Sequence, residues 1–136
     1  MTKVSEEEIS SSTYRIIDAN LNRLREGIRV VEDVCRYYKN SKELSKRLKI
    51  LRHKIRIINS KEFLKHRDIK NDPLKKTTGS ESFRLNIESI IVSNIKRAQE
   101  SSRVLEEIFK LTSVEESQKF KDIRYELYDV EKEILL

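Results

Sequence analysis

The sequence predicts an all-α fold: two repeated long helical hairpins packed as an antiparallel four-helix bundle with internal pseudo-two-fold symmetry. The 136-residue chain holds 2 Gly and 1 Pro, and 38% of its residues are charged, a composition that favours long helices over a sheet with many tight turns. Apolar residues recur at three- and four-residue steps along most of the chain, as they do on one face of a helix. In addition, residues 16–33 and 90–107 repeat each other without a gap. A duplicated helical unit is therefore expected.

The two copies, 74 residues apart, share 8 of 18 positions. The identical pairs are Ile16/Ile90, Ile17/Ile91, Asn20/Asn94, Arg23/Arg97, Glu26/Glu100, Arg29/Arg103, Val30/Val104 and Glu32/Glu106. Packing in a core explains the repeated Ile and Val, but it does not explain the pattern Asn-x-x-Arg-x-x-Glu-x-x-Arg. The repeated polar residues indicate two related half-sites, or one site between two related halves.

The first half is expected to form two helices. The first covers about residues 12–38, with an apolar face formed by Ile17, Leu21, Leu24, Ile28, Val31 and Cys35. Asn40 and Ser41 break this helix, and Ser41 can cap a second helix over about residues 42–59. The apolar face of the second helix is formed by Leu44, Leu48, Leu51, Ile55 and Ile58.

The second half repeats this plan after a connection. A short turn is expected over residues 61–65, followed by a loop over 66–82 that holds the only Pro. An ordered loop of this length is more often functional than a passive connection. A third helix is expected over about 83–111, and Ser113 with Glu116 forms a capping-box pattern that opens a fourth helix to about residue 134. The chain is expected to form one domain, 1–136, with repeat halves at about 12–60 and 83–136.

The charge of the chain is unevenly distributed. Its formal net charge is +6, yet residues 39–76 hold 14 Lys or Arg against 4 Asp or Glu. A basic middle segment predicts an anionic partner: a phosphorylated small molecule, a nucleic acid or an acidic protein. The start of the chain lacks the apolar core of a secretory signal, and no apolar run has the length of a membrane helix. With a single Cys, these features predict a cytoplasmic protein without a membrane partner.

The repeated Asn and Arg lie along one edge of the apolar stripe on a helical wheel. In the first copy Asn20, Arg23 and Gly27 form a row at i, i+3 and i+7, and in the second copy the row is Asn94, Arg97 and Ser101. The small third residue leaves room for a ligand, or for close approach of another helix. Arginine at a half-buried edge is costly unless it meets an anion, so we expect these rows to bind phosphate. Glu26, Arg29 and their counterparts fit equally well as ordinary surface ion pairs.

Other candidate residues give narrower expectations. Cys35 lies on the apolar face and is expected in the core. The counterpart of His53 is Tyr125, which favours a packing role for the histidine. Asp68 and Asp72 supply oxygen ligands of the kind that a divalent ion takes, and no Cys/His cluster indicates zinc. Only Gly27 and Gly79 are present, so no glycine-rich phosphate loop can form, and Arg, Lys and helix N-termini must hold any phosphate.

Several segments together resemble a known family. They are YRIIDANLNRLREGIRVVED at 14–33, LRHKI at 51–55, RD at 67–68, and NIKRAQESSRVLEE at 94–107 followed by IRYELYDVEK. Nearly the whole chain resembles the small α-helical domain often fused ahead of thiamine phosphate synthase, a second type of hydroxymethylpyrimidine phosphate kinase. Here the domain is expected to stand alone. After Asp72 the family usually has a small residue, Gly and Thr, whereas this chain has Pro73, Leu74 and Lys75.

The resemblance implies ATP and Mg²⁺ as cosubstrates, and phosphorylation of 4-amino-2-methyl-5-hydroxymethylpyrimidine phosphate to the diphosphate. Combined with the rows described above, it implies catalytic roles for Arg23, Arg97 and Asp68. It implies substrate or phosphate binding by Asn20, Gly27, Arg29, Arg52, Arg67, Asn94, Arg103 and Arg124. It implies metal binding by Glu26, Glu100 and Asp72. We further expect the two rows to face one shared cleft, with Arg67 and Asp68 closing over it.

Two other functions remain open. The second predicted helix is basic around its circumference, which suggests a nucleic-acid-binding module, although the repeated carboxylates argue against it; its basic residues are Lys46, Arg47, Lys49, Arg52, Lys54 and Arg56. The other is a non-catalytic helical partner of a thiamine-synthesis enzyme, with thiamine phosphate synthase itself as the expected partner. A duplicated helical domain could also pair as a homodimer.

Overall fold

The computed structural model describes residues 6–56, 60–79 and 83–136, and these ranges contain helices and no strand. The elements are α1 (Glu6–Asp33), a π-helix η1 (Val34–Tyr38), α2 (Lys42–Lys54), α3 (Ser60–Lys65), α4 (Ile87–Phe109) and α5 (Val114–Leu135). The predicted all-α class is confirmed. No helix in the described ranges is long and apolar enough to cross a membrane.

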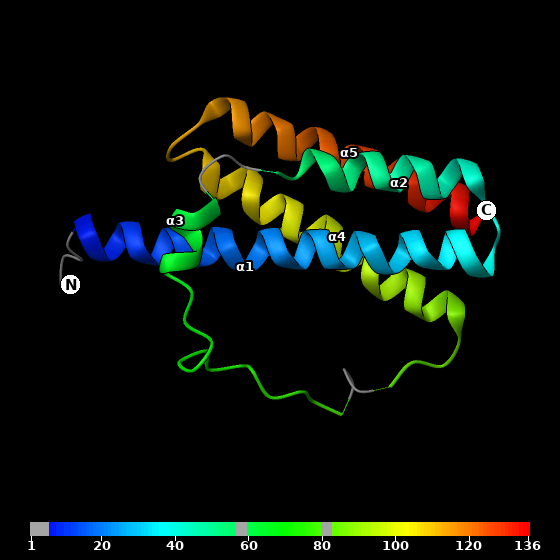
Figure 1. Ribbon diagram of the computed structural model, residues 1–136, viewed down its shortest axis with the longest axis horizontal. Helices are drawn as coiled ribbons and strands as arrows, with labels where there is room; N and C mark the ends of the chain where they lie inside the picture. The colour runs from blue at the N-terminus through cyan, green and yellow to red at the C-terminus, as the bar shows by residue number, and fades with distance from the viewer. Residues whose placement is uncertain (1–5, 57–59, 80–82) are drawn as a thin grey trace.

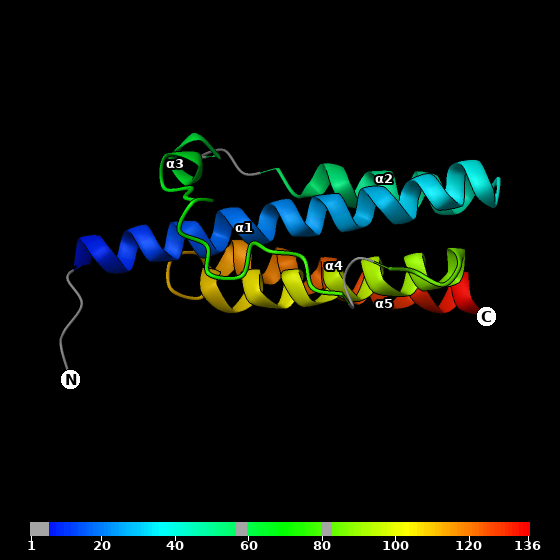
Figure 2. The ribbon, with the colours of Figure 1, turned by 90° about the horizontal axis from the view of Figure 1, so that it is seen from below.

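Two hairpins stack on each other. Helix α1 runs antiparallel to α2, and α4 runs antiparallel to α5 (Figure 1). Seen from the side, α1 and α2 form one layer and α4 and α5 the other (Figure 2). The layers meet chiefly through α1 and α4, while α2 and α5 touch each other only slightly. The pseudo-two-fold relation between the hairpins stays a prediction.

The predicted apolar stripes form the core. The six stripe residues of the first helix, Ile17 to Cys35, are all buried, as are Leu48, Leu51 and Ile55 of the second. Ile58 lies outside the described residues. At the turn between α4 and α5, the rings of Phe109 and Phe120 stack with their centroids 5.5 Å apart. Cys35 is fully buried in the core, as predicted, and this burial raises the pKa of its thiol.

The helix boundaries differ from the predicted ones for local reasons. α1 begins at Glu6 rather than near residue 12, and it continues to Tyr38 through η1. Asn40 then takes a left-handed φ of 53°, which Asn tolerates, and the hydroxyl of Ser41 caps α2 by accepting from the Leu44 amide. α2 ends at Lys54 instead of residue 59, and residues 57–59 lie outside the described part.

Helix α4 starts four residues later than predicted. Asn86 and Ser89 form a capping box, each side chain accepting from the other residue's backbone amide at 2.8 Å and 3.0 Å. This reciprocal cap satisfies two of the orphan amides at the helix start, so the helix begins at Ile87. Ser113 caps α5 as predicted, accepting from the Glu116 amide at 3.2 Å.

Helix α3 fixes the start of the long loop against α1. Tyr14 of α1 contacts the rings of Phe63 and His66, with centroids 5.5 Å and 4.9 Å away. The Nδ1 atom of His66 also lies 3.0 Å from the Ser11 hydroxyl. The loop therefore leaves α3 at a defined place beside α1 and then runs toward α4 (Figure 2).

Candidate functional site

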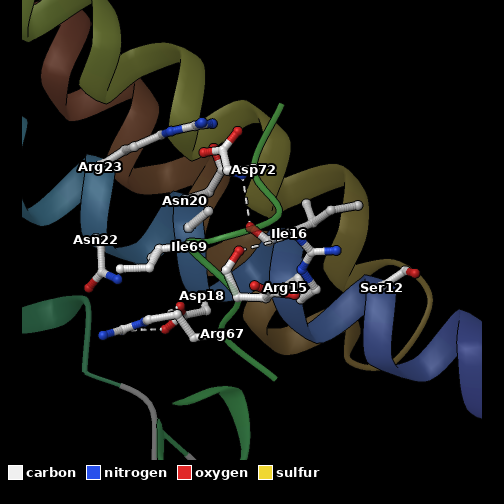
Figure 3. Close-up of a pocket in the computed structure, with 12 residues that line it drawn as sticks. Ser12, Arg15, Ile16, Asp18, Asn20, Asn22, Arg23, Arg67, Ile69 and Asp72 are labelled. Atoms are coloured by element: carbon white, nitrogen blue, oxygen red, sulfur yellow. Dashed lines mark hydrogen bonds and ion pairs between the residues drawn. The ribbon is translucent and has the colours of Figure 1, made fainter. Parts of the chain in front are cut away.

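A pocket of about 520 Å³ lies where the start of the long loop crosses α1 (Figure 3). Its α1 residues are Ser12, Arg15, Ile16, Asp18, Ala19, Asn20, Asn22 and Arg23. Its loop residues are Arg67, Asp68, Ile69 and Asp72. This volume falls within the range of about 300–1,000 Å³ that is usual for small-molecule sites. The pocket holds three guanidinium groups and three carboxylates, so its chemistry depends on which of these are already paired.

Asp18 and Arg67 pair with each other and hold the loop on α1. The Nε and Nη2 atoms of Arg67 each donate to one oxygen of Asp18 at 2.7 Å. Asp18 is nearly fully buried, with 8% exposed, and a bidentate pair in such a setting is geometrically specific. The hydrogen bond to Asp18 raises the pKa of Arg67, and the nearby charge of Glu26 raises it further. Both groups are therefore committed to positioning the loop.

The carboxylate of Asp68 is committed to the fold of the loop. Its two oxygens accept from the amide and the side-chain nitrogen of Asn71, at 3.2 Å and 2.6 Å. Both bonds lower the pKa of Asp68, and the bond from the Asn71 side chain has the larger effect. Its backbone carbonyl accepts a long 3.5 Å bond from Arg15. Asp68 thus shapes the loop, and the catalytic role predicted for it stays a prediction.

Arg23, Arg15 and Asp72 are the charged groups that stay available in the pocket. Arg23 is exposed and makes no hydrogen bond or ion pair within the described ranges. Arg15 makes only its long bond to the loop. Asp72 accepts from the Leu74 amide through Oδ1, at 2.9 Å, which leaves Oδ2 uncommitted among the described residues. In Figure 3 Arg23 and Asp72 lie on the same side of the pocket.

The repeated Asn residues have the same local role in both copies. Asn20 donates to the carbonyl of Ile16, and Asn94 donates to that of Ile90, each at 2.8 Å. Asn20 lines the pocket, whereas Asn94 does not belong to the lining. The shared backbone contact accounts for part of the repetition without any ligand.

Gly27 lies where α1 approaches α4 closely. A Cβ atom at this position would stand 2.9 Å from the backbone oxygen of Asn94 and 3.4 Å from the Cβ of Ala98. Close helix approach, one of the two alternatives that its position suggested, therefore explains the small residue. A ligand contact by Gly27 stays a prediction, and Gly27 does not line the pocket.

Four predicted phosphate-binding arginines are engaged in ion pairs that recur in the two halves. Glu32 accepts from Arg52 at 2.8 Å, and Glu106 accepts from Arg124 at 2.9 Å, so each pair joins the two helices of one hairpin. Glu32 and Glu106 are almost fully buried. Arg29 and Arg103, one turn before these glutamates, add surface contacts to them at 3.4 Å and 3.1 Å.

These pairs give the repeated Glu and Arg a structural role. The hydrogen bond to Glu32 is the main cause that raises the pKa of Arg52. The pKa of Arg124 is raised first by its bond to Tyr128 and then by Glu106. The structure brings none of these four arginines into the pocket.

Arg97, Glu26 and Glu100 are exposed and do not line the pocket. Together with Arg23, they are the repeated polar residues whose side chains make no hydrogen bond or ion pair among the described residues. The structure therefore gives no internal contact that explains why Arg23/Arg97 and Glu26/Glu100 repeat. The shared cleft between the two rows stays a prediction.

The predicted metal ligands are not gathered in one place. No group of three or more His, Cys, Asp or Glu side chains suited to an ion occurs in the part of the chain that the structure describes. Mg²⁺ is commonly held by one or two carboxylates together with substrate phosphates and water, so a dedicated cage is not needed. Asp72 is the carboxylate in the pocket whose oxygens are not both taken.

Asp18, Arg15 and Asn22 line the pocket but were not predicted from the sequence, because none of them is repeated in the second copy. The counterpart of Asp18 is Val92. At this position one copy has a charged residue and the other has an apolar one. Such a difference between aligned copies indicates a site that is present in only one half. The counterpart of Arg15, one turn before Asp18, is Ser89, so this charge also belongs to the first half alone.

Comparison with known proteins gives a consistent result. A model of the ThiD2 family matches residues 15–133. The thiamine-phosphate synthase of Nostoc sp. is 35% identical over 131 residues, which cover 96% of this chain and 37% of that protein. The enzyme of the same name from Thermosynechococcus vestitus is 37% identical over 123 residues, covering 90% and 35%. That of Rhodopirellula baltica is 33% identical over 132 residues, covering 93% and 35%.

The chain therefore spans little more than a third of the length of the curated relatives it matches. No solved structure matches it.

Proposed function

Because the chain belongs to the ThiD2 family, we propose that it is an ATP-dependent kinase acting on 4-amino-2-methyl-5-hydroxymethylpyrimidine phosphate. The product is the corresponding diphosphate, a precursor of thiamine phosphate. The related thiamine-phosphate synthases contain a region homologous to nearly all of this chain. That relationship supports a role in thiamine biosynthesis, and the kinase activity is the specific proposal.

The pocket between α1 and the loop carries the proposal. It combines two available guanidinium groups, Arg15 and Arg23, with a loop fixed in place by the Asp18–Arg67 pair. Guanidinium groups bind phosphate oxygens through short, charge-assisted hydrogen bonds. Arg23 and Arg15 would hold phosphate groups of the two substrates, with the side-chain oxygen of Asn20 available for a neutral donor on the acceptor.

This reaction needs no general base from the protein. The second pKa of a phosphate monoester is about 6, so the attacking oxygen is already deprotonated at neutral pH. An acceptor phosphate oxygen bonds to the γ-phosphorus of ATP, the bond to the bridging oxygen breaks, and ADP leaves with that electron pair. Catalysis is then mostly positioning and neutralisation of charge. Arg23 is well suited to neutralise phosphate charge, because its guanidinium group is not paired with any other residue in the described ranges.

Asp72 fits the part of a magnesium ligand. Asp18 and Asp68 have both oxygens occupied by Arg67 and Asn71, whereas Asp72 keeps one oxygen available. Magnesium, when bound with the nucleotide, supplies additional neutralisation of phosphate charge. Asp72 lies on the loop that the Asp18–Arg67 pair holds against α1, so its free oxygen would already be placed at the pocket.

The nucleic-acid alternative is less well supported. Arg47 of the basic helix is bound to three acids of α5, with distances of 3.2 Å to Glu126, 2.5 Å to Asp129 and 3.3 Å to Glu133. Arg52 is bound to Glu32. The basic face that the sequence suggested is therefore partly used to join α2 to the rest of the bundle.

The proposal is tested by an ADP-release assay with ATP, Mg²⁺ and the pyrimidine monophosphate, with the unphosphorylated pyrimidine alcohol as the matched acceptor. We expect turnover with the monophosphate and much less with the alcohol, because arginines that lose their phosphate partner are left unpaired. Equal rates with both acceptors would contradict this version of the site. Absence of ADP release from a protein that binds thiamine-phosphate synthase would support the non-catalytic partner instead.

A further inference from the structure

A second hollow of about 350 Å³ lies beside α2, and the described residues that line it are all basic. They are Arg25 of α1, Arg52 and His53 of α2, and Arg56 just after α2. It shares no lining residue with the candidate active-site pocket. Three of these four residues are arginines, and like charges repel across a short distance unless an anion lies between them.

The positive charge of this hollow is only partly compensated. Arg52 is paired with Glu32 at 2.8 Å. The side chains of Arg25, His53 and Arg56 make no hydrogen bond or ion pair within the described residues. A further cation stands nearby, since Lys119 donates to the backbone oxygen of Arg56 at 3.4 Å, although Lys119 is itself paired with Glu116. At least two guanidinium charges are therefore available to an anion.

The second half of the chain shows how the same position is filled without charge. The counterpart of Arg52 is Arg124, which is bound to Glu106 in the same way. The counterparts of His53 and Arg56, 72 positions on, are Tyr125 and Tyr128. Their ring centroids lie 5.1 Å and 5.7 Å from the Arg124 guanidinium.

The remaining counterpart is also neutral. Gln99 stands 74 positions after Arg25, is buried and donates to Glu131 at 3.2 Å. The fold thus accepts neutral residues at the positions that correspond to Arg25, His53 and Arg56, beside the shared Glu–Arg pair. The Glu–Arg pair therefore does not need Arg25 and Arg56 beside it, and both guanidinium groups stay available to a ligand.

We infer that the hollow lined by Arg25, Arg52, His53 and Arg56 binds the phosphate group of a small anion. The available charge suits a group with two or more negative charges, such as pyrophosphate or the phosphate tail of a nucleotide. This site is separate from the pocket assigned to phosphoryl transfer, and the inference does not depend on the kinase activity.

The second half also supplies the test variant. The triple substitution Arg25→Gln, His53→Tyr and Arg56→Tyr gives the first half the residues that stand at the matching positions of the second half. The control is Lys46→Gln with Lys49→Gln, which removes two exposed positive charges from α2 outside the hollow. Circular dichroism and the Tm establish that both variants are folded.

Binding is measured by NMR titration with pyrophosphate, ADP and adenosine, following the backbone amides of residues 52–56. These amides report the local site whether or not the ligand also binds elsewhere. We expect saturable shifts with pyrophosphate or ADP, none with adenosine, and binding at least about tenfold weaker in the triple variant, as loss of charged hydrogen bonds predicts. A response to both anions identifies the phosphate group alone as the ligand, and a response to ADP only identifies a nucleotide.

Three results would overturn the inference. The first is local binding in the triple variant within about twofold of the parent chain. The second is equal weakening in the Lys46/Lys49 control, which would show that only general charge matters. The third is local binding of an oligonucleotide with steep salt dependence but no response to the small anions, which would assign the surface to nucleic acid.

Discussion

Glu106 and Arg124 illustrate how single residues of the repeat serve the fold. Both side chains are largely buried, at 6% and 11% exposed, and they join α4 to α5. Arg124→Ala would leave the carboxylate with only its surface contact to Arg103. Loss of one partner from a buried pair typically costs about 3–5 kcal/mol.

We expect Arg124→Ala to lower the free energy of unfolding by about 3 kcal/mol, measured by urea denaturation. The exposed pair of Lys65 and Glu62 provides the control, and Lys65→Ala should leave the urea midpoint unchanged. The double variant Glu106→Leu/Arg124→Leu should lose less than Arg124→Ala, because no charge stays buried. Equal stability of Arg124→Ala and the parent chain would show that the pair has no structural role.

Arg23, unlike Arg124, is available for the reaction, because it lines the pocket and its side chain has no partner within the described residues. We expect Arg23→Ala to reduce kcat/KM by roughly 30–1,000-fold, equivalent to about 2–4 kcal/mol of transition-state stabilisation, with little change in Tm. Arg36→Ala is the matched control, since this exposed arginine contacts Tyr37 at the other end of the first hairpin. The assignment fails if Arg23→Ala retains near-normal kinetics.

At the scale of elements, the crossing of α1 and α4 depends on Gly27. A side chain there meets the Asn94 backbone oxygen, and backbone cannot move aside without shifting a whole helix. Overpacking of this kind costs about 1–3 kcal/mol, and the small gain in helix propensity of Val over Gly does not offset it.

We therefore expect Gly27→Val to be destabilising by about 2 kcal/mol in thermal or urea unfolding. Gly79→Val is the control, because a Cβ at Gly79 would meet nothing within 4 Å. If both variants unfold alike, α1 and α4 do not approach closely at this position.

The same scale shows what the sequence could and could not predict about the fold. The apolar stripes identified the four long helices and the core, because burial follows helical periodicity directly. The helix ends were harder to place, since they depend on single caps. The capping box of Asn86 and Ser89 starts α4 late, while Glu6–Ser11 extends α1 without an apolar stripe to mark it.

The site was predictable only in part. The row of Asn20 and Arg23 was found because it repeats, and Arg67, Asp68 and Asp72 because the loop is long and polar. Arg52 and Arg124 also fit the repeat, yet they meet Glu32 and Glu106. No pattern within one helix shows whether an arginine on the next helix will reach its carboxylate. That information exists only once the hairpins are packed.

For the molecule as a whole, the duplication separates scaffold from site. Both halves keep the buried Glu–Arg pair. In contrast, Asp18 of the first copy corresponds to Val92 in the second, and Arg25 corresponds to Gln99. The pocket on α1 therefore belongs to the first half and its loop. The remaining question at this scale is whether the exposed row of α4 contributes to the same reaction.

Arg97→Ala addresses that question. If the two rows face one cleft, as predicted from the duplication, this variant should lose kcat/KM to a degree similar to Arg23→Ala while remaining helical by circular dichroism. Near-normal kcat/KM in Arg97→Ala alongside a strong loss in Arg23→Ala would confine the reaction to the first half.

The most direct test of the proposed kinase activity is ³¹P NMR of the chain incubated with ATP, Mg²⁺ and 4-amino-2-methyl-5-hydroxymethylpyrimidine phosphate. We predict that the γ-phosphate signal of ATP and the monophosphate signal decline together. ADP and a second pair of coupled diphosphate signals should appear in equal amounts, and Arg23→Ala should form them far more slowly. Unchanged ATP, or release of inorganic phosphate with the pyrimidine monophosphate intact, would contradict phosphoryl transfer to the pyrimidine.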